Sequence, residues 1–117
     1  MPKNDSVILP TVMRYYKMAK MQIDVKEIND RAMELLSDGK YDPAQQYFYE
    51  GKNRFPCAQT YNNLGLFLYE NGISLRNGKC RAAKAIGKKY VAQALEIMRD
   101  PIILYNYGRM LFDEGDY

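Results

Sequence analysis

The stretch Tyr61–Gly72, YNNLGLFLYENG, decides the fold because the chain repeats its pattern. Its core is a small residue, a Leu three positions later and a Gly four positions beyond that Leu. This order occurs at three places: Ala32/Leu35/Gly39, Gly65/Leu68/Gly72 and Gly108/Leu111/Gly115. The interval from the first copy to the second is 33 residues at every anchor, and from the second to the third it is 43. Three anchors that keep step across both intervals predict an internal repeat.

Local signals predict that the repeat is helical. Asp24–Glu27 has the form of a capping box, which predicts a helix start near Val25. Asp-Pro pairs at 42–43 and 100–101 predict two further starts, and the repeated glycines suit helix ends. About six helices follow, near residues 11–21, 25–38, 43–54, 58–71, 79–98 and 101–115. No segment alternates with the two-residue period of a strand.

Two short antiparallel helices in about 34 residues form a helical-hairpin repeat. The first unit resembles the tetratricopeptide repeat (TPR) family in its order of small, Leu, Gly, Tyr, Ala, aromatic, small and Pro positions. These positions are Ala32, Leu35, Gly39, Tyr41, Ala44, Phe48, Gly51 and Pro56. The resemblance covers 25–117. It implies an all-α, TPR-like solenoid with a right-handed superhelix, in which 1–24 is an N-terminal helical extension.

The later units depart from the family pattern. The repeats are expected at 25–57, 58–100 and 101–117, and the second has about ten extra residues, near 73–82. The third has a first helix but not its partner, which leaves the apolar stripe Leu104, Gly108 and Leu111 uncovered. We therefore expect either a longer protein or a covering chain, with self-association through this last helix as one form of the second alternative.

The resemblance also implies a binding surface, because the first helices of such repeats line a concave groove that holds extended peptides. The candidate groove residues are Asn29, Asn62, Asn63, Leu66, Glu70, Tyr105, Asn106 and Arg109. Asn63 and Asn106 are equivalent by repeat, and an amide side chain can donate to and accept from a peptide main chain. The alternative is that these asparagines are simply neutral surface residues. The expected function is therefore non-catalytic recognition of a protein or peptide of unknown identity.

A basic segment offers a different function. Its six cations occur without an acid: Arg76, Lys79, Arg81, Lys84, Lys88 and Lys89. The chain has 17 Lys and Arg against 14 Asp and Glu, so the other residues carry 11 against 14. Such a segment is either a solvated helix face or a site for an anion or nucleic acid. Nucleic acid is the weaker expectation, since no aromatic residues interleave with the cations.

The amino-acid composition excludes several classes of function. The chain of 117 residues has no His and two Cys, which removes histidine-dependent catalysis and histidine metal sites. We expect no enzyme activity, cofactor or metal, although a regulatory fragment of a larger protein stays open. No signal peptide or membrane span is visible, so a cytoplasmic location is expected. The Tyr and Met residues of 13–21 are expected to pack in a core, and the alternative is an exposed surface that binds a partner.

Overall fold

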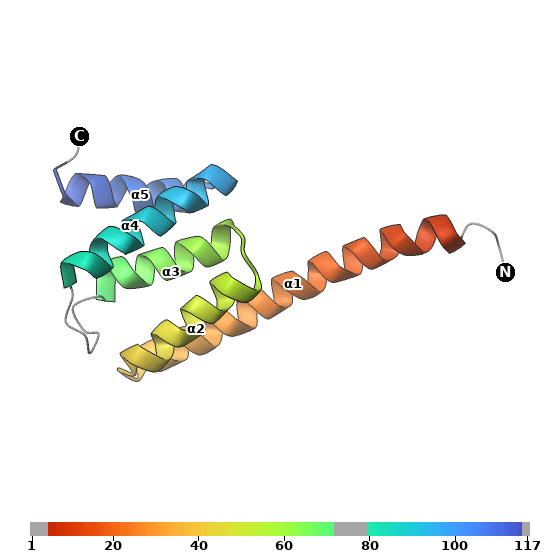
Figure 1. Ribbon diagram of the computed structural model, residues 1–117, viewed down its shortest axis with the longest axis horizontal. Helices are drawn as coiled ribbons and strands as arrows, with labels where there is room; N and C mark the ends of the chain where they lie inside the picture. The colour runs from red at the N-terminus through yellow and green to blue at the C-terminus, as the bar shows by residue number, and fades with distance from the viewer. Residues whose placement is uncertain (1–4, 72–79, 116–117) are drawn as a thin grey trace.

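The computed structural model describes residues 5–71 and 80–115 (Figure 1). All regular structure in these ranges is helical, which confirms the all-α prediction. The helices are α1 (Asp5–Ser37), α2 (Tyr41–Arg54), α3 (Ala58–Asn71), α4 (Cys80–Ile97) and α5 (Pro101–Asp113). None of the described helices is long and apolar enough to cross a membrane.

The helix count is five rather than six, because α1 continues through the break expected at Asp24. The Asp24 carboxylate accepts a hydrogen bond from Lys20 Nζ at 3.2 Å, an i,i+4 pair inside one helix, instead of capping a new one. Neither Gly nor Pro lies between Pro10 and Gly39, so nothing local interrupts the backbone hydrogen bonds. The capping-box prediction was therefore wrong.

Most other boundaries follow their local signals. Gly39 ends α1 at a φ of 75°, with Lys40 N–H donating to the Leu35 carbonyl and Gly39 N–H to the Leu36 carbonyl. This is the Schellman pattern. Asp100 caps α5 by accepting a hydrogen bond from Ile102 N–H at 2.8 Å. Helix α2 begins at Tyr41, before the expected start, with Lys40 at its N-cap position and no side-chain cap. The expected helix end at Gly72 lies outside the described residues.

The helices pack in chain order, α1 with α2, then α3, α4 and α5 (Figure 1). One core cluster joins α1, α2 and α3, and its Phe48 and Phe67 rings lie 4.9 Å apart between centroids. A second cluster joins α3, α4 and α5 around Val91 and Met110, both fully buried. Helix α3 contributes to both clusters and is accordingly buried on most of its surface.

Helices α3 and α4 approach each other closely at two glycines. A Cβ placed on Gly65 would lie 2.6 Å from the Gly87 carbonyl oxygen, and one on Gly87 would lie 2.5 Å from the Gly65 carbonyl oxygen. Only glycine permits two backbones to approach this closely. The repeat had marked Gly65 as a small position, but Gly87 was not singled out from the sequence.

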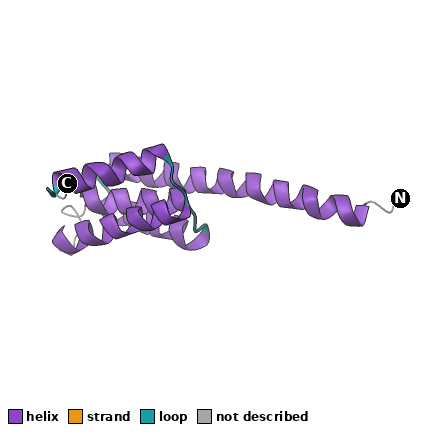
Figure 2. Cartoon of the chain, turned by 90° about the horizontal axis from the view of Figure 1, so that it is seen from above, coloured by secondary structure: helices purple, strands orange, loops and turns teal. Residues whose placement is uncertain are grey.

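The N-terminal half of α1 projects beyond the other helices in both views (Figures 1 and 2). Every residue from 10 to 20 is exposed, and the molecule measures 61 × 34 × 18 Å. Met13, Tyr15, Tyr16 and Met18 are between 49% and 67% exposed. The prediction that they pack in a core was wrong, since α2 and α3 pack only against the later part of α1.

Candidate functional site

A groove of about 550 Å³ lies where α1 passes the starts of α3 and α5. We call it the methionine groove. Its lining residues are Met18, Met21, Gln22, Val25, Cys57, Ala58, Gln59, Asn62, Asn63, Met98, Asp100, Ile102 and Ile103. Methionine, which is unbranched and polarisable, adapts to ligands of different shape. The groove thus combines adaptable apolar walls with several amide side chains.

Two local hydrogen-bonded turns fix the walls of the methionine groove. Between α2 and α3, the buried Thr60 hydroxyl donates to the Phe55 carbonyl at 2.8 Å and accepts from Cys57 N–H at 3.1 Å. Between α4 and α5, Asp100 is held by its capping bond to Ile102 N–H. Because both turns are tied to the helix that follows them, the sides of the groove formed by α3 and α5 are held in place.

Three amide side chains of the methionine groove are free to bind a ligand. Gln22, Gln59 and Asn63 make no side-chain hydrogen bond to any described residue. Each amide can both donate and accept, which matches the two polar groups of a peptide unit. The one charged lining residue is Asp100, and its carboxylate already caps α5. The groove therefore suits a neutral, partly apolar ligand with peptide-like polar groups.

The other candidate asparagines are placed differently from the repeat expectation. Asn106 Nδ2 donates to Asn62 Oδ1 at 3.2 Å, and both residues are 7% exposed. This bond joins α5 to α3, so Asn106 supports the wall instead of facing a ligand. Asn29 and Asn63 line one smaller space between α1, α2 and α3. Asn106 thus bonds to Asn62, and the correspondence of Asn63 with Asn106 between repeats stays a prediction.

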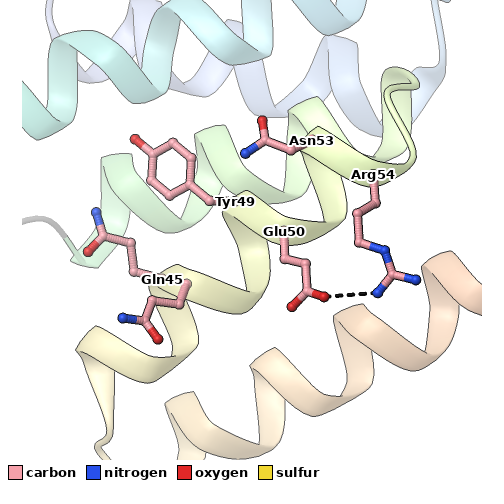
Figure 3. A pocket seen from close by; sticks show the side chains of 6 residues that line it. Gln45, Tyr49, Glu50, Asn53 and Arg54 are labelled. Carbon is pink, nitrogen blue, oxygen red and sulfur yellow. Dashed lines mark hydrogen bonds and ion pairs between the residues drawn. The ribbon is translucent and has the colours of Figure 1, made fainter.

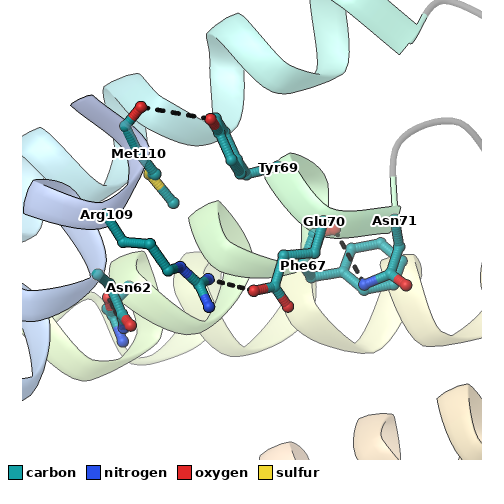
Figure 4. A network of polar contacts seen from close by, with 8 residues as sticks. Asn62, Phe67, Tyr69, Glu70, Asn71, Arg109 and Met110 are labelled. Atoms are coloured by element: carbon teal, nitrogen blue, oxygen red, sulfur yellow. Dashed lines mark hydrogen bonds and ion pairs between the residues drawn. The ribbon is translucent and has the colours of Figure 1, made fainter. Parts of the chain in front are cut away.

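Further along the α3–α5 contact, polar groups are also paired with each other (Figure 4). Arg109 forms an ion pair with Glu70, which raises the pKa of the guanidinium. Arg109 Nε is buried without a hydrogen-bond partner among the described residues. The Tyr69 hydroxyl donates to the Met110 carbonyl at 3.4 Å. These groups attach α5 to α3 and are therefore less available to a ligand than the amides of the methionine groove.

Two further candidate groove residues take part in none of these hydrogen bonds and ion pairs. Leu66 is half-buried and packs against the second core cluster. Tyr105 is 68% exposed on α5. Neither lines the methionine groove. Of the eight candidates, the structure brings only Asn62 and Asn63 to this groove.

The described cations of the basic segment are partly used within the chain. Lys84 Nζ lies 5.1 Å from the centre of the Tyr69 ring, and Lys88 forms an ion pair with Glu114. Lys89 is exposed on α4. Arg76 and Lys79 lie outside the described residues, and the side chain of Arg81 is not described either. The Lys88–Glu114 ion pair reduces the positive charge that this part of α4 presents to an anion.

A second hollow, on the outer side of α2, is lined by one helix alone (Figure 3). The Glu50–Arg54 ion pair, 2.9 Å long, crosses it. A hollow with a single wall covers little of a ligand, whereas binding pockets enclose most of one. We therefore assign no function to this surface, and its exposed amides Gln46 and Asn53 are suitable control positions.

Sequence reasoning missed a cluster of three tyrosines around one lysine. Lys52 Nζ lies 5.9, 5.8 and 5.3 Å from the ring centres of Tyr49, Tyr61 and Tyr90. Burial, with a smaller contribution from Tyr90, raises the pKa of the Tyr49 phenol. The three rings come from α2, α3 and α4, so the cluster joins successive helices through cation–π contacts.

Residues of α1 were the main omission at the site itself. Met18, Met21 and Gln22 reach the methionine groove only because α1 is one continuous helix. The excess of methionine in 13–21 was the available signal, and it was interpreted as core packing. Among the described residues, no group of three or more His, Cys, Asp or Glu side chains could hold a metal ion.

Comparison with known proteins adds no relative. A scan against protein-family models, a search of curated proteins and a search of solved structures each found no match. The resemblance to tetratricopeptide repeats therefore rests on the spacing of the repeated residues, without support from a family match.

Proposed function

We propose that this chain is a non-catalytic binding module that holds a short peptide segment of a partner protein in the methionine groove. The proposal includes a TPR-like repeat solenoid of right-handed superhelical sense, in which α1–α2 and α3–α4 are successive hairpins and α5 begins a third. We place the activity in the cytoplasm, because a free thiol such as Cys57 persists in a reducing compartment.

One observation carries the proposal: unused amides and apolar side chains line the same groove. Gln59 and Asn63 are on α3, and Met18, Met98 and Ile102 lie around them. An extended peptide has alternating side chains and regularly spaced main-chain polar groups. A large apolar side chain of the peptide would occupy the methionine walls, while the amides bind its main chain. The basic segment has less support, since Lys84 and Lys88 contact Tyr69 and Glu114.

Selection from a random peptide library displayed on phage would test this proposal, because it does not require that the partner be identified first. We expect enriched peptides to share one or two large apolar residues and to bear little net charge. The double variant Gln59→Ala/Asn63→Ala removes the two α3 amides and should weaken the selected peptides at least about tenfold, since each lost hydrogen bond contributes about 1 kcal/mol.

The matched control is Gln46→Ala/Asn53→Ala, the same chemical change on the outer side of α2. It should leave the affinity within about twofold. Equal weakening by the two double variants, or peptides enriched for acidic residues whose binding falls steeply with salt, would contradict a neutral site in the methionine groove.

A further inference from the structure

The projecting half of α1 carries an apolar stripe that none of the described residues covers. Val12, Tyr16, Ala19 and Ile23 follow one another at intervals of four, three and four residues, and Tyr15 lies at the margin. Val12, Tyr16 and Ile23 are 52%, 66% and 57% exposed. Intervals of three and four residues place side chains along one line of a helix, as in a coiled-coil seam.

This stripe faces away from the rest of the protein. At about 100° per residue, its residues fall within roughly 100° of arc. The buried residues later in α1, Val25, Ala32 and Leu35, fall on the nearly opposite side. Met18 and Met21, which line the methionine groove, also lie away from the stripe. Helix α1 thus has one apolar side that packs against the rest of the chain and another apolar side that is exposed.

We propose that the stripe pairs antiparallel with the same stripe of a second copy of this chain. With the two-fold axis between Tyr16 and Ala19, Tyr16 packs against the partner's Ala19, and Val12 packs against the partner's Ile23. Each large side chain thereby meets a small or medium one, the alternation that fills a helix interface without voids. A parallel pair in register would instead set two tyrosines together beside two alanines.

The charged side chains of the projecting half lie outside the proposed seam or at its margin. Arg14 and Lys17 lie on the side opposite the stripe, outside the contact. Lys20, at the margin of the stripe, already pairs with Asp24. In the antiparallel arrangement Lys20 lies on the same flank as the partner's Met13 and Lys20, and the Asp24 carboxylate of each chain offsets the charge of its own Lys20. Such a contact is isologous and closes as a dimer.

The length of the stripe sets the expected strength. Residues 10–23 are 14 helical residues, which span about 21 Å. This contact is smaller than a permanent dimer interface, and small interfaces belong to dissociable complexes. We therefore expect a monomer–dimer equilibrium with a dissociation constant on the order of 10–100 μM.

Sedimentation equilibrium between roughly 5 and 500 μM, a range that brackets this constant, would test the pairing. Tyr16→Glu places a charge in the seam and should weaken the dimer at least about tenfold. Lys17→Glu is the adjacent control, which changes the net charge by more but lies off the stripe, and it should leave the dimer within about twofold. Both positions are in the projecting half, so urea unfolding of the two variants should match that of the parent chain.

Orientation is tested by cross-linking in a Cys57→Ser/Cys80→Ser background. Antiparallel pairing predicts that Val12→Cys chains form disulfides with Ile23→Cys chains in a mixture, while each variant alone cross-links poorly. Disulfides within each single variant would overturn the antiparallel arrangement. A chain that is monomeric at all these concentrations, or a dimer lost in Leu104→Glu but not in Tyr16→Glu, would overturn the pairing. Monomers that bind phosphatidylserine vesicles in a Lys17-dependent way would assign the stripe to a membrane surface instead.

Discussion

The glycines of two related sequences, YNNLG on α3 and YNYG on α5, have opposite surroundings. A Cβ on Gly65 would meet the α4 backbone within 2.9 Å, whereas one on Gly108 would meet nothing within 4 Å. The neighbouring residues differ in the same way, since Leu64 is fully buried and Leu104 is 42% exposed. The motif therefore specifies a helix with a small residue on one side. Whether that side is buried depends on the helix that packs against it.

The largest expected effect comes from replacing a leucine with alanine on α3, compared with the same replacement on α5. Leu64→Ala should lower the free energy of unfolding by about 3 kcal/mol, because it leaves a cavity in a fully packed site. Leu104→Ala should cost about 1 kcal/mol or less, since solvent already reaches that side chain. Urea denaturation followed by circular dichroism measures both values. Similar losses for the two variants would mean that α5 is covered as fully as α3.

A substitution at the two glycines should act in opposite directions. Gly65→Ala forces α3 and α4 apart and should destabilise the protein by about 2 kcal/mol, despite the better helix propensity of alanine. Gly108→Ala meets open space and should stabilise it by about 0.5–1 kcal/mol through that propensity. The same urea titrations provide the measurement. Stabilisation by Gly65→Ala would contradict the close contact with Gly87.

Signals confined to a few residues predicted the fold best. Gly39 and Asp100 end and begin helices as expected, because their effect depends only on the adjacent turn. The Asp24 capping box failed, since the same residues are also compatible with a helix interior. The site was harder to predict. Met18 reaches the groove only through an unbroken α1, and the Asn62–Asn106 bond depends on how α5 packs on α3.

The attachment of α5 to α3 can be divided between its two polar contacts. A double-mutant cycle at Asn62 and Asn106 should give a coupling energy of about 1 kcal/mol, because the amides are buried and satisfy each other. The Glu70–Arg109 pair is 44% and 38% exposed at its side chains, so its cycle should give about 0.5 kcal/mol and fall with salt. A larger, salt-insensitive coupling at the ion pair would reverse this ranking.

The smallest expected effect is a loss of stability at alkaline pH, which we attribute to the buried Tyr69 on α3. Burial, with a smaller contribution from Glu114, raises the pKa of the Tyr69 phenol above its ordinary value of 10.0, so the folded state favours the neutral form. The resulting stability is present below pH 10 and is lost as pH rises through the folded-state pKa.

Urea midpoints between about pH 8 and 11 should therefore fall less steeply in Tyr69→Phe than in the parent chain. Tyr105→Phe, on the exposed side of α5, is the matched control and should keep the parental slope, because Tyr105 is 68% exposed. If both variants kept that slope, burial of Tyr69 would not be the source of the alkaline sensitivity.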